Sequence, residues 1–366
     1  MLIKELCDVQ KITINPQKQE NVLFTHYSLP SFDNNKTPDI VYGKEILSSK
    51  YVVPKNVILY NKLNLRFKRI WNIKNNTKIN CICSGEFIPL VIKNNIILQD
   101  YLYYYLLTDK LNKKLLETAH GTSSSHQRID INDLLNYEIK VPSMEEQLHI
   151  VDTIGSIDDL IDNLTNQISK YKEIMSKELS KLTSKSTSTI KLSSIVKESK
   201  EKIKNNDVKL MSVVNTSNLV LQEEYFNKNT ASKDMCKYKI LKKYYFAYNP
   251  ARINIGSIGM HNYDILGAIS PIYIVFTVDN NYIYYLDIFK SSEYMIKNIN
   301  KKASGSVRQN LPFEQFASIE IPNIDLNELI NFNLHCQTFY SQIKSTENEI
   351  QQLINLKNKY LQKFFA

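Results

Sequence analysis

Two long segments of the chain place mainly apolar residues at alternating spacings of four and three. They cover residues 143–183 and 325–366. The first series consists of Ile150, Ile154, Ile157, Ile161, Leu164, Ile168, Tyr171, Met175, Glu178 and Leu182. Because this spacing keeps apolar side chains on one face of a helix with a 3.5-residue repeat, both segments are predicted to be coiled-coil helices about 60 Å long.

The two helical segments correspond to each other at a displacement of 182 residues. Ser143 and Glu146 form a capping pattern at the first start, and Asp325 and Glu328 lie at the matching positions. We expect the two helices to pair antiparallel within the chain. Pairing with another copy or another protein is the alternative. The expected core between them consists of Ile154, Ile157, Ile161, Ile168, Phe339, Ile343, Ile350 and Leu353.

The remainder of the chain also resembles itself. Residues 57–61, which read as a strand, recur as residues 245–249, and a helical pattern at 98–121 recurs at 282–305. A third match pairs Arg128, Ile131, Ile139 and Pro142 with Arg308, Leu311, Ile319 and Pro322 at a constant shift of 180. The chain is therefore predicted to be an internal repeat.

The predicted fold class is α+β. Two similar globular α/β domains are joined by two long helices that form an antiparallel coiled coil with a pseudo-twofold axis. The expected boundaries are residues 1–142 for the first globular domain, 143–183 for the first helix, 184–189 for a linker, 190–322 for the second globular domain and 325–366 for the second helix.

Composition and charge narrow the class of protein. The chain has 366 residues, 43% of them hydrophobic, which is enough to bury a core in each domain. There are 46 basic against 37 acidic residues, a net charge of +9 that favours an acidic partner. No apolar run is long enough to cross a membrane, the start lacks a signal-peptide pattern, and the five cysteines are scattered. We expect a cytoplasmic protein with free thiols and no metal site.

Only five of the basic residues are arginines, and they fall in short polar loops. Arginine offers a planar fork that can bind guanine, asparagine and glutamine can bind adenine, and serine or lysine can bind phosphate. Loops at 60–69 and 121–128 and their counterparts at 248–256 and 305–310 are therefore predicted to bind DNA. The candidate residues are Lys62, Asn64, Arg66, Lys68, Arg69, Ser124, Gln127, Arg128, Asn249, Arg252, Asn254, Ser306, Arg308 and Gln309. The alternative for any one arginine is a surface ion pair.

Divergence between the copies supports two different targets. Residues 15–50 and 205–237 scarcely align, as a common scaffold with two distinct recognition surfaces would require. Two such surfaces joined by helices of about 60 Å are predicted to contact a split DNA site whose halves lie between one and two helical turns apart.

No catalytic pattern is found in the chain. A nucleophile elbow, a Ser/His/Asp order and a phosphate-binding glycine loop are all absent from the sequence. Asp158, Asp159 and Asp162 resemble paired carboxylates, but they lie in the first heptad helix, where an outward, solvated acidic face is the expected explanation. We therefore predict no catalytic residues in this chain.

The chain resembles the specificity subunits of type I restriction-modification systems over nearly its whole length. The most specific match is the run Ile139-Lys-Val-Pro142-Ser-Met-Glu-Glu146-Gln147 leading into the heptads, similar to the strand, proline and Glu-Gln of that family. The second copy departs from it, with Asn327-Glu328 where Glu-Gln is usual.

This resemblance implies a non-catalytic subunit with two target-recognition domains. It also implies partners: double-stranded DNA with a split site, two adenine methyltransferase subunits and an added ATP-driven endonuclease subunit. S-adenosylmethionine, ATP and magnesium would belong to those partners, with no cofactor in this chain. The competing hypotheses are a stand-alone DNA-modifying enzyme and a coiled-coil structural adaptor.

Overall fold

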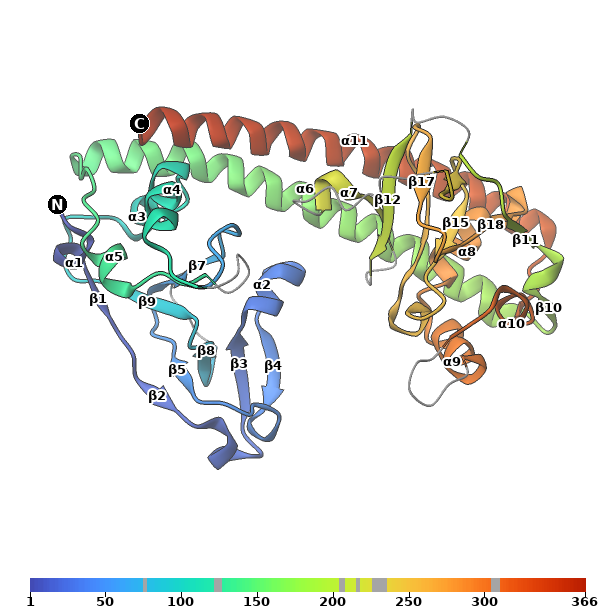
Figure 1. The fold of residues 1–366 in the computed structure, drawn as a ribbon, viewed down its shortest axis with the longest axis horizontal. Coiled ribbons are helices and arrows are strands. Elements are labelled where there is room, and N and C mark those ends of the chain that lie inside the picture. Colours follow the sequence, from blue (N-terminus) through green and yellow to red (C-terminus); the bar gives the residue numbers. More distant parts are fainter. Residues whose placement is uncertain (75–77, 122–126, 204–207, 215–217, 226–235, 304–309) are drawn as a thin grey trace. The chain divides into compact units, whose positions relative to one another are not determined.

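The structure is a computed structural model of the full chain, and it describes all residues except 75–77, 122–126, 204–207, 215–217, 226–235 and 304–309. It consists of two compact units (Figure 1). Unit 1 comprises Met1–Asn163 with Glu349–Ala366, and unit 2 comprises Leu164–Asn348. Each unit thus contains a globular part and one portion of each long helix.

Unit 1 is built from two sheets and a layer of helices. Its strands are β1 (Cys7–Val9), β2 (Thr13–Ile14), β3 (Leu23–Tyr27), β4 (Asp39–Tyr42), β5 (Lys50–Val52), β6 (Val57–Asn61), β7 (Ile70–Ile73), β8 (Cys81–Cys83) and β9 (Phe87–Ile92). Its helical elements are α1 (Ile3–Leu6), η1 (Pro16–Gln19), α2 (Leu29–Asn35), η2 (Gly43–Glu45), α3 (Gln99–Leu106), α4 (Asp109–Thr118), α5 (Ile131–Leu135) and the start of α6 (Met144–Lys185).

Unit 2 repeats this plan. Its strands are β10 (Thr189–Lys191), β11 (Val196–Ser199), β12 (Lys209–Val214), β13 (Asn218–Leu221), β14 (Lys239–Leu241), β15 (Phe246–Tyr248), β16 (Ile258–Met260), β17 (Gly267–Ile269), β18 (Ile274–Val278) and β19 (Glu320–Pro322). Its helical elements are η3 (Leu192–Ser194), α7 (Gln222–Tyr225), η4 (Ile253–Ile255), η5 (Asn280–Tyr282), α8 (Ile283–Phe289), α9 (Glu293–Lys302), α10 (Phe313–Ala317) and most of α11 (Leu326–Phe364).

The strand orders of the two units correspond, with β5-β8-β3-β4 matched by β14-β17-β12-β13, except that β2 has no counterpart in the second sheet of unit 2. Unit 1 has a four-stranded sheet β1-β9-β6-β7 and a five-stranded sheet β2-β5-β8-β3-β4, and unit 2 has β11-β18-β15-β16 and β13-β12-β17-β14. In each second sheet one strand pair is parallel, β3 with β8 and β12 with β17, while the neighbouring pairs are antiparallel. The predicted internal repeat is therefore present at the level of topology.

The central strand β6 shows how the layers of unit 1 pack. Ile58 and Tyr60 face the cluster formed with the helices, whereas Val57 and Leu59 face the second sheet. Side chains of a strand alternate between the two faces of its sheet, so a strand covered on both sides reads as a continuous apolar run. This explains why all five residues of β6 are buried.

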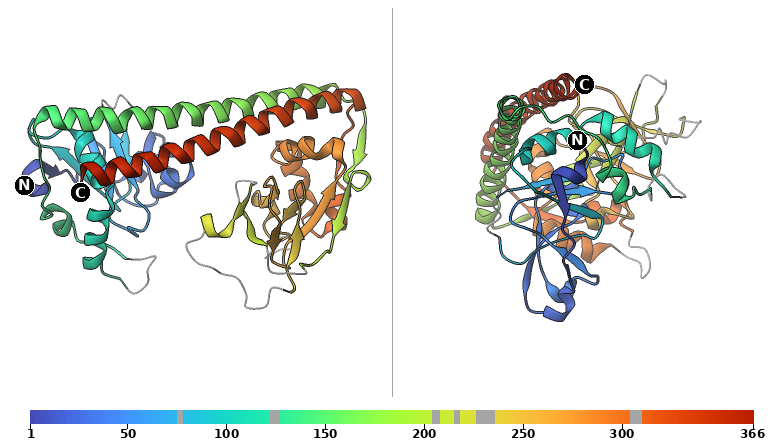
Figure 2. Two further views of the ribbon diagram at one scale, coloured as in Figure 1. Left: turned by 90° about the horizontal axis from the view of Figure 1, so that it is seen from above. Right: turned by 90° about the vertical axis from the view of Figure 1, so that its left-hand side faces the viewer.

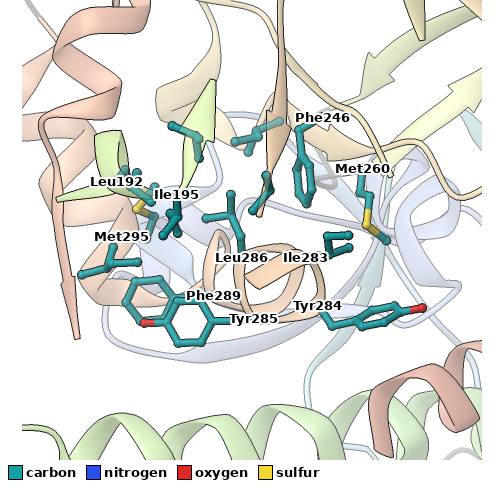
Figure 3. Close-up of a cluster of buried hydrophobic side chains, with 14 of the residues drawn as sticks. Leu192, Ile195, Phe246, Met260, Ile283, Tyr284, Tyr285, Leu286, Phe289 and Met295 are labelled. Carbon is teal, nitrogen blue, oxygen red and sulfur yellow. The ribbon is translucent and has the colours of Figure 1, made fainter. Parts of the chain in front are cut away.

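In unit 2 the helix-side cluster is rich in aromatic rings. Tyr285 and Phe289 of α8 stack with ring centroids 5.2 Å apart, next to Met295 of α9 and Leu192 (Figure 3). The Tyr285 hydroxyl donates to the Pro322 carbonyl at 3.2 Å, because a buried phenol needs a hydrogen-bond partner. In unit 1 the equivalent Tyr101 donates to the carbonyl of Lys140 at 3.1 Å.

The long helices pair antiparallel inside each unit (Figure 2). In unit 1, Ile150 and Ile154 of α6 share a buried cluster with Leu361 of α11, which lies at the far end of that helix. In unit 2, Met175 of α6 shares a cluster with Cys336 of α11. The predicted core residues Ile154, Ile157 and Ile343 are buried, and Ile161, Ile168, Phe339, Ile350 and Leu353 are half-buried. The predicted α+β fold with long paired helices is confirmed.

One expectation about α6 is wrong. Asp158 is not part of a solvated outer face, because its side chain is only 30% exposed and accepts hydrogen bonds from Lys357 at 2.6 and 2.8 Å and from Tyr104 at 3.0 Å. Its neighbour Asp159 is exposed, as expected. Sequence spacing alone could not show that Lys357, at a heptad position of α11, would require a counter-charge.

Within the described part of the chain, no helix has the length and apolar character needed to cross a membrane.

Candidate nucleic-acid interface

The two predicted loops of unit 1 are joined by backbone hydrogen bonds. The Ile129 amide donates to the Lys62 carbonyl at 3.1 Å, and the Asn64 amide donates to the Gln127 carbonyl at 2.8 Å. The loop between β6 and β7 therefore lies beside the segment that leads into α5. These segments are more than 60 positions apart in the sequence, and their juxtaposition forms one polar surface, which we call the unit 1 loop surface (residues 62–69, 127 and 128).

The loop after β6 is held by local polar contacts and one apolar anchor. The Asn61 side chain accepts a hydrogen bond from the Leu63 amide at 3.0 Å, an arrangement typical of asparagine at turns. Asn64 adopts a left-handed conformation with φ of 52°, which asparagine tolerates better than most residues. Leu65 is buried at 3% exposure. The loop is thus anchored at its centre while Arg66 remains exposed.

Unit 2 contains the same loop between β15 and β16. The Asn249 side chain accepts from the Ala251 amide at 3.0 Å, and Ile253 is buried at 2% exposure. The Leu311 amide donates to the Pro250 carbonyl at 3.0 Å, which joins this loop to the segment leading into α10. The unit 2 loop surface (residues 249–257 and 310) therefore has the same construction.

Strand pairing and one loop hydrogen bond show which residues are equivalent in the loops after β6 and β15. Tyr60 pairs with Ile70 and Tyr248 pairs with Ile258, so nine residues separate the paired positions in both units. The Phe67 amide donates to the Asn64 carbonyl at 3.2 Å. At a shift of 188, the Ile255 amide likewise donates to the Arg252 carbonyl at 3.1 Å.

The predicted equivalence of Arg128 with Arg308 is wrong. Helix α5 starts at Ile131 and α10 at Phe313, and the bonds from Ile129 to Lys62 and from Leu311 to Pro250 correspond, so the shift here is 182. The counterpart of Arg128 is consequently Asn310. The shift of 180 aligns similar residue types. The structure instead shows which positions are equivalent through hydrogen bonds between distant segments.

At the same shift of 182, Gln147 corresponds to Leu329, and both are 0% exposed. The Gln147 side chain donates from Nε2 to the carbonyls of Ile96 at 2.9 Å and Pro142 at 3.0 Å, and its Oε1 accepts from the Leu98 backbone amide at 2.8 Å. Gln147 of the Glu-Gln pair at the first helix start thus has a structural role. In unit 2 the apolar Leu329 fills the corresponding buried position.

Two of the arginines on the unit 1 loop surface form bidentate ion pairs. Arg69 binds both carboxylate oxygens of Asp33 at 2.6 and 2.7 Å, and its side chain is only 12% exposed. Arg128 binds both oxygens of Glu86 at 3.1 and 2.7 Å while 53% of its side chain is exposed. Hydrogen bonding to Glu86, with the attraction of its charge, raises the pKa of Arg128 above its ordinary value. Arg69 is therefore structural, whereas Arg128 remains accessible.

The other predicted residues of unit 1 differ in accessibility. The Lys68 ammonium binds Asp109 at 2.6 Å and the Leu107 carbonyl at 2.7 Å. Lys62, Asn64 and Gln127 are half-buried, and the Asn64 Oδ1 is a buried acceptor without a partner among the described residues. Within the described chain, the Arg66 side chain has no ion-pair or hydrogen-bond partner, which leaves its guanidinium available.

In unit 2, Arg252 is the exposed arginine, and Asn249 and Asn254 are half-buried. The predicted residues Ser124, Ser306, Arg308 and Gln309 lie outside the described residues. Sequence reasoning missed Asp33, Glu86 and Asn310. Asp33 lies on α2 and Glu86 lies in the turn before β9, and neither position carries a pattern that identifies its arginine partner, so only the fold could reveal these two residues.

Comparisons with known proteins find a family model, a curated relative and a solved structure that are similar to this chain. Residues 1–173 match the family model described as type I restriction modification DNA specificity domain. The type I restriction enzyme HindI specificity subunit of Haemophilus influenzae is 23% identical over 169 residues, which cover 41% of this chain and 36% of that relative. The match therefore spans about a third of the curated relative.

A solved structure shows the fold of the whole chain. The type I restriction-modification system S subunit from M. genitalium matches with a TM-score of 0.55 at 15% identity, covering 100% of this chain and 95% of that one.

Proposed function

We propose that this chain, whose residues 1–173 match the type I restriction modification DNA specificity domain, is the DNA-specificity subunit of a type I restriction-modification complex. In this role it binds double-stranded DNA at a bipartite site and positions two adenine methyltransferase subunits on it. An ATP-dependent restriction subunit is a further partner. The complex acts on DNA in the cytoplasm.

The repeated loop surface carries this proposal. Each unit brings a loop of nine residues and a second segment together through equivalent hydrogen bonds, from Ile129 to Lys62 and from Leu311 to Pro250. The exposed side chains at these equivalent places differ, with Arg66 in one unit and Arg252 in the other at different loop positions. Two surfaces of one construction and different chemistry suit two different half-sites.

A repeated apolar patch supports two copies of one partner. Met144 and Leu148 at the start of α6 are 38% and 46% exposed, and Leu326 and Ile330 at the start of α11 are 55% and 40% exposed. These residues correspond at the shift of 182. Exposed apolar residues on adjacent helical turns are typical of an interaction surface. Because the patch occurs twice, the same partner surface fits both, and we assign it to the methyltransferase subunits.

The proposed division of labour leaves chemistry to the partners. S-adenosylmethionine would bind to the methyltransferase subunits, and ATP and magnesium to the restriction subunit, with no cofactor in this chain. In the described part of the chain, His, Cys, Asp and Glu side chains form no group of three or more that could hold a metal ion. A stand-alone DNA-modifying enzyme and a structural adaptor are the alternatives to test.

The test measures DNA binding and methylation with and without the cognate methyltransferase subunits. We expect the assembled complex to bind a split site and to methylate adenine in both halves, whereas the chain alone transfers no methyl group. The logarithm of the affinity should fall linearly with the logarithm of the salt concentration, because phosphate contacts release counterions. Methyl transfer by the chain alone would show a stand-alone enzyme, and binding insensitive to salt and sequence would show an adaptor.

A further inference from the structure

The equivalence of the two loop surfaces permits comparison position by position. The shift of 188 pairs Arg66 with Asn254, and it pairs Asn64 with Arg252. The shift of 182 pairs Arg128 with Asn310. At these three positions, one unit has arginine where the other has asparagine.

The remaining described arginine serves as an internal comparison. Arg69 is bound to Asp33, lies over the Phe67 ring with its guanidinium carbon 4.8 Å from the centroid, and is mostly buried. Its counterpart is Ser257, which is 1% exposed. The exchange with asparagine thus occurs at the loop positions that present an exposed arginine, and it is absent where the arginine is structural.

Arginine and asparagine differ in the base that they recognise. Arginine donates two hydrogen bonds to the O6 and N7 atoms of guanine, and asparagine binds N6 and N7 of adenine through one donor and one acceptor. Because the flanking strand pairs and one loop hydrogen bond are equivalent, Arg66 and Asn254 occupy the same position along their loops. The loop backbones differ at Asn64, with φ of 52°, and at its counterpart Arg252, with φ of −138°. The same loop position therefore carries a different base preference in each unit.

Glu86, the residue that binds Arg128, also has a different kind of counterpart in unit 2. The Lys62 amide donates to the Glu86 carbonyl at 3.0 Å. Tyr60 pairs with Ile88 and Tyr248 pairs with Ile274, which sets a shift of 186 between the partner strands, so position 86 corresponds to position 272. The turns before β9 and β18 contain equivalent hydrogen bonds. The Phe87 amide donates to the Ser84 carbonyl at 3.0 Å, and the Tyr273 amide donates to the Ser270 carbonyl at 3.1 Å.

Glu86 in unit 1 consequently corresponds to Ile272 in unit 2, which is 63% exposed. Glutamate accepts a hydrogen bond from the N4 amino group of cytosine, and an apolar side chain contacts the methyl group of thymine. Arg128 with Glu86 therefore suits the two bases of a G·C pair, and Asn310 with Ile272 suits those of an A·T pair.

We propose that Arg66 and Asn254 are specificity-determining residues, with Arg66 contacting guanine in the half-site of unit 1 and Asn254 contacting adenine at the equivalent place in the half-site of unit 2. Arg128 and Asn310 repeat the exchange at a second position. Arg252 adds a guanine contact in unit 2, where the unit 1 counterpart Asn64 has its oxygen buried. This inference rests on the proposed function.

The test selects preferred sites from DNA with randomised half-sites, using the full chain assembled with its methyltransferase subunits. We expect Arg66→Asn to lower the preference for guanine at one position of one half-site by roughly 5- to 150-fold, the range expected for a lost bidentate contact. Asn254→Arg should replace adenine by guanine in the other half-site. The unaltered half-site in each variant shows that the protein is folded.

Lys113→Asn is the matched control, because Lys113 is exposed on α4 and the variant loses the same charge. It should leave both base preferences unchanged. Absence of any split site for the unaltered protein would contradict the proposed function. A split site that contains no guanine in the half read by unit 1, or that stays the same in Arg66→Asn with only weaker binding, would overturn the present inference and identify Arg66 as a phosphate contact.

Discussion

Lys357 of α11 places its ammonium against both carboxylate oxygens of Asp158 on α6, at 2.6 and 2.8 Å. The side chains are 16% and 30% exposed, and the Tyr104 hydroxyl also donates to Asp158 at 3.0 Å. The ammonium lies 5.4 Å from the centroid of the Tyr104 ring. A charged pair thus connects α3, α6 and α11 at a place where the heptad pattern would have an apolar residue.

Replacing Asp158 by asparagine should destabilise the helix pair of unit 1 by about 1–3 kcal/mol, because Lys357 would be left partly buried without its counter-charge. Hydrogen exchange followed peptide by peptide would show faster exchange in residues 144–163 and 349–364, with unit 2 unchanged. Asp159→Asn, at the exposed neighbouring position, should have no such effect. Equal exchange in both variants would show that the pair contributes nothing measurable.

Replacing Gln147 by leucine should destabilise unit 1 by about 2–4 kcal/mol. The variant loses three hydrogen bonds and leaves the Leu98 amide and the carbonyls of Ile96 and Pro142 without a partner. The equivalent position in unit 2 is Leu329, so the result shows whether unit 1 requires the hydrogen bonds of Gln147 or whether a buried leucine is sufficient there. Urea unfolding monitored by hydrogen exchange would measure the change. Gln337→Leu, at an exposed position on α11, serves as the control and should change stability by less than about 0.5 kcal/mol.

Replacing Arg128 by alanine should weaken recognition of one half-site by about 1–3 kcal/mol and spare the other, if the residue contacts a base. Glu86→Gln removes a negative charge and releases the guanidinium but keeps an oxygen that can accept a hydrogen bond from cytosine, so it should tighten DNA binding by about 0.5–1 kcal/mol. Binding assays on site variants altered in one half at a time would measure both effects. An equal loss on specific and random DNA would show that Arg128 is a general phosphate contact.

Asp264 should make unit 2 sensitive to acid. Hydrogen bonds from Lys243, at 2.5 Å, and from Lys344 lower the pKa of its carboxyl to about 2. A carboxyl with a lowered pKa in the folded state stabilises the fold above its ordinary pKa of 3.8, and the contribution is lost as the pH falls from about 4 to about 2.

The free energy of unfolding of unit 2, measured by urea unfolding at each pH, should therefore fall over that pH interval, and Asp264→Asn should reduce the fall. Glu347→Gln, which alters an exposed carboxylate on α11, is the matched control and should behave as the unaltered chain. An identical pH profile for Asp264→Asn would contradict the role of this ion-pair cluster.

Much of the architecture could be predicted because it depends on local periodicity. The predicted helix starts at Ser143 and Asp325 are capped as expected, with the Glu146 amide donating to Ser143 at 3.2 Å and the Glu328 amide to Asp325 at 3.2 Å. The strand repeat of residues 57–61 and 245–249 also holds. Neither inference needed contacts between distant segments.

The details of the candidate interface could not be predicted in the same way. The sequence places Arg69 and Arg128 in polar loops, and either could have been free or paired. Their carboxylate partners Asp33 and Glu86 lie 36 and 42 positions away in the chain. Side chains at such separations meet only after the sheets have formed, so no local pattern identifies the pair.

By itself, the sequence determined that this protein is a duplicated α+β chain with two long helices and arginines confined to loops, because periodicity, repetition and composition are properties of neighbouring residues. The tertiary structure alone decided which arginines and asparagines of the two copies are equivalent. Hydrogen bonds between distant backbone segments set that register, and they place Arg128 opposite Asn310 and Arg66 opposite Asn254. A repeat of arginines in the sequence thereby becomes an exchange of arginine and asparagine in space.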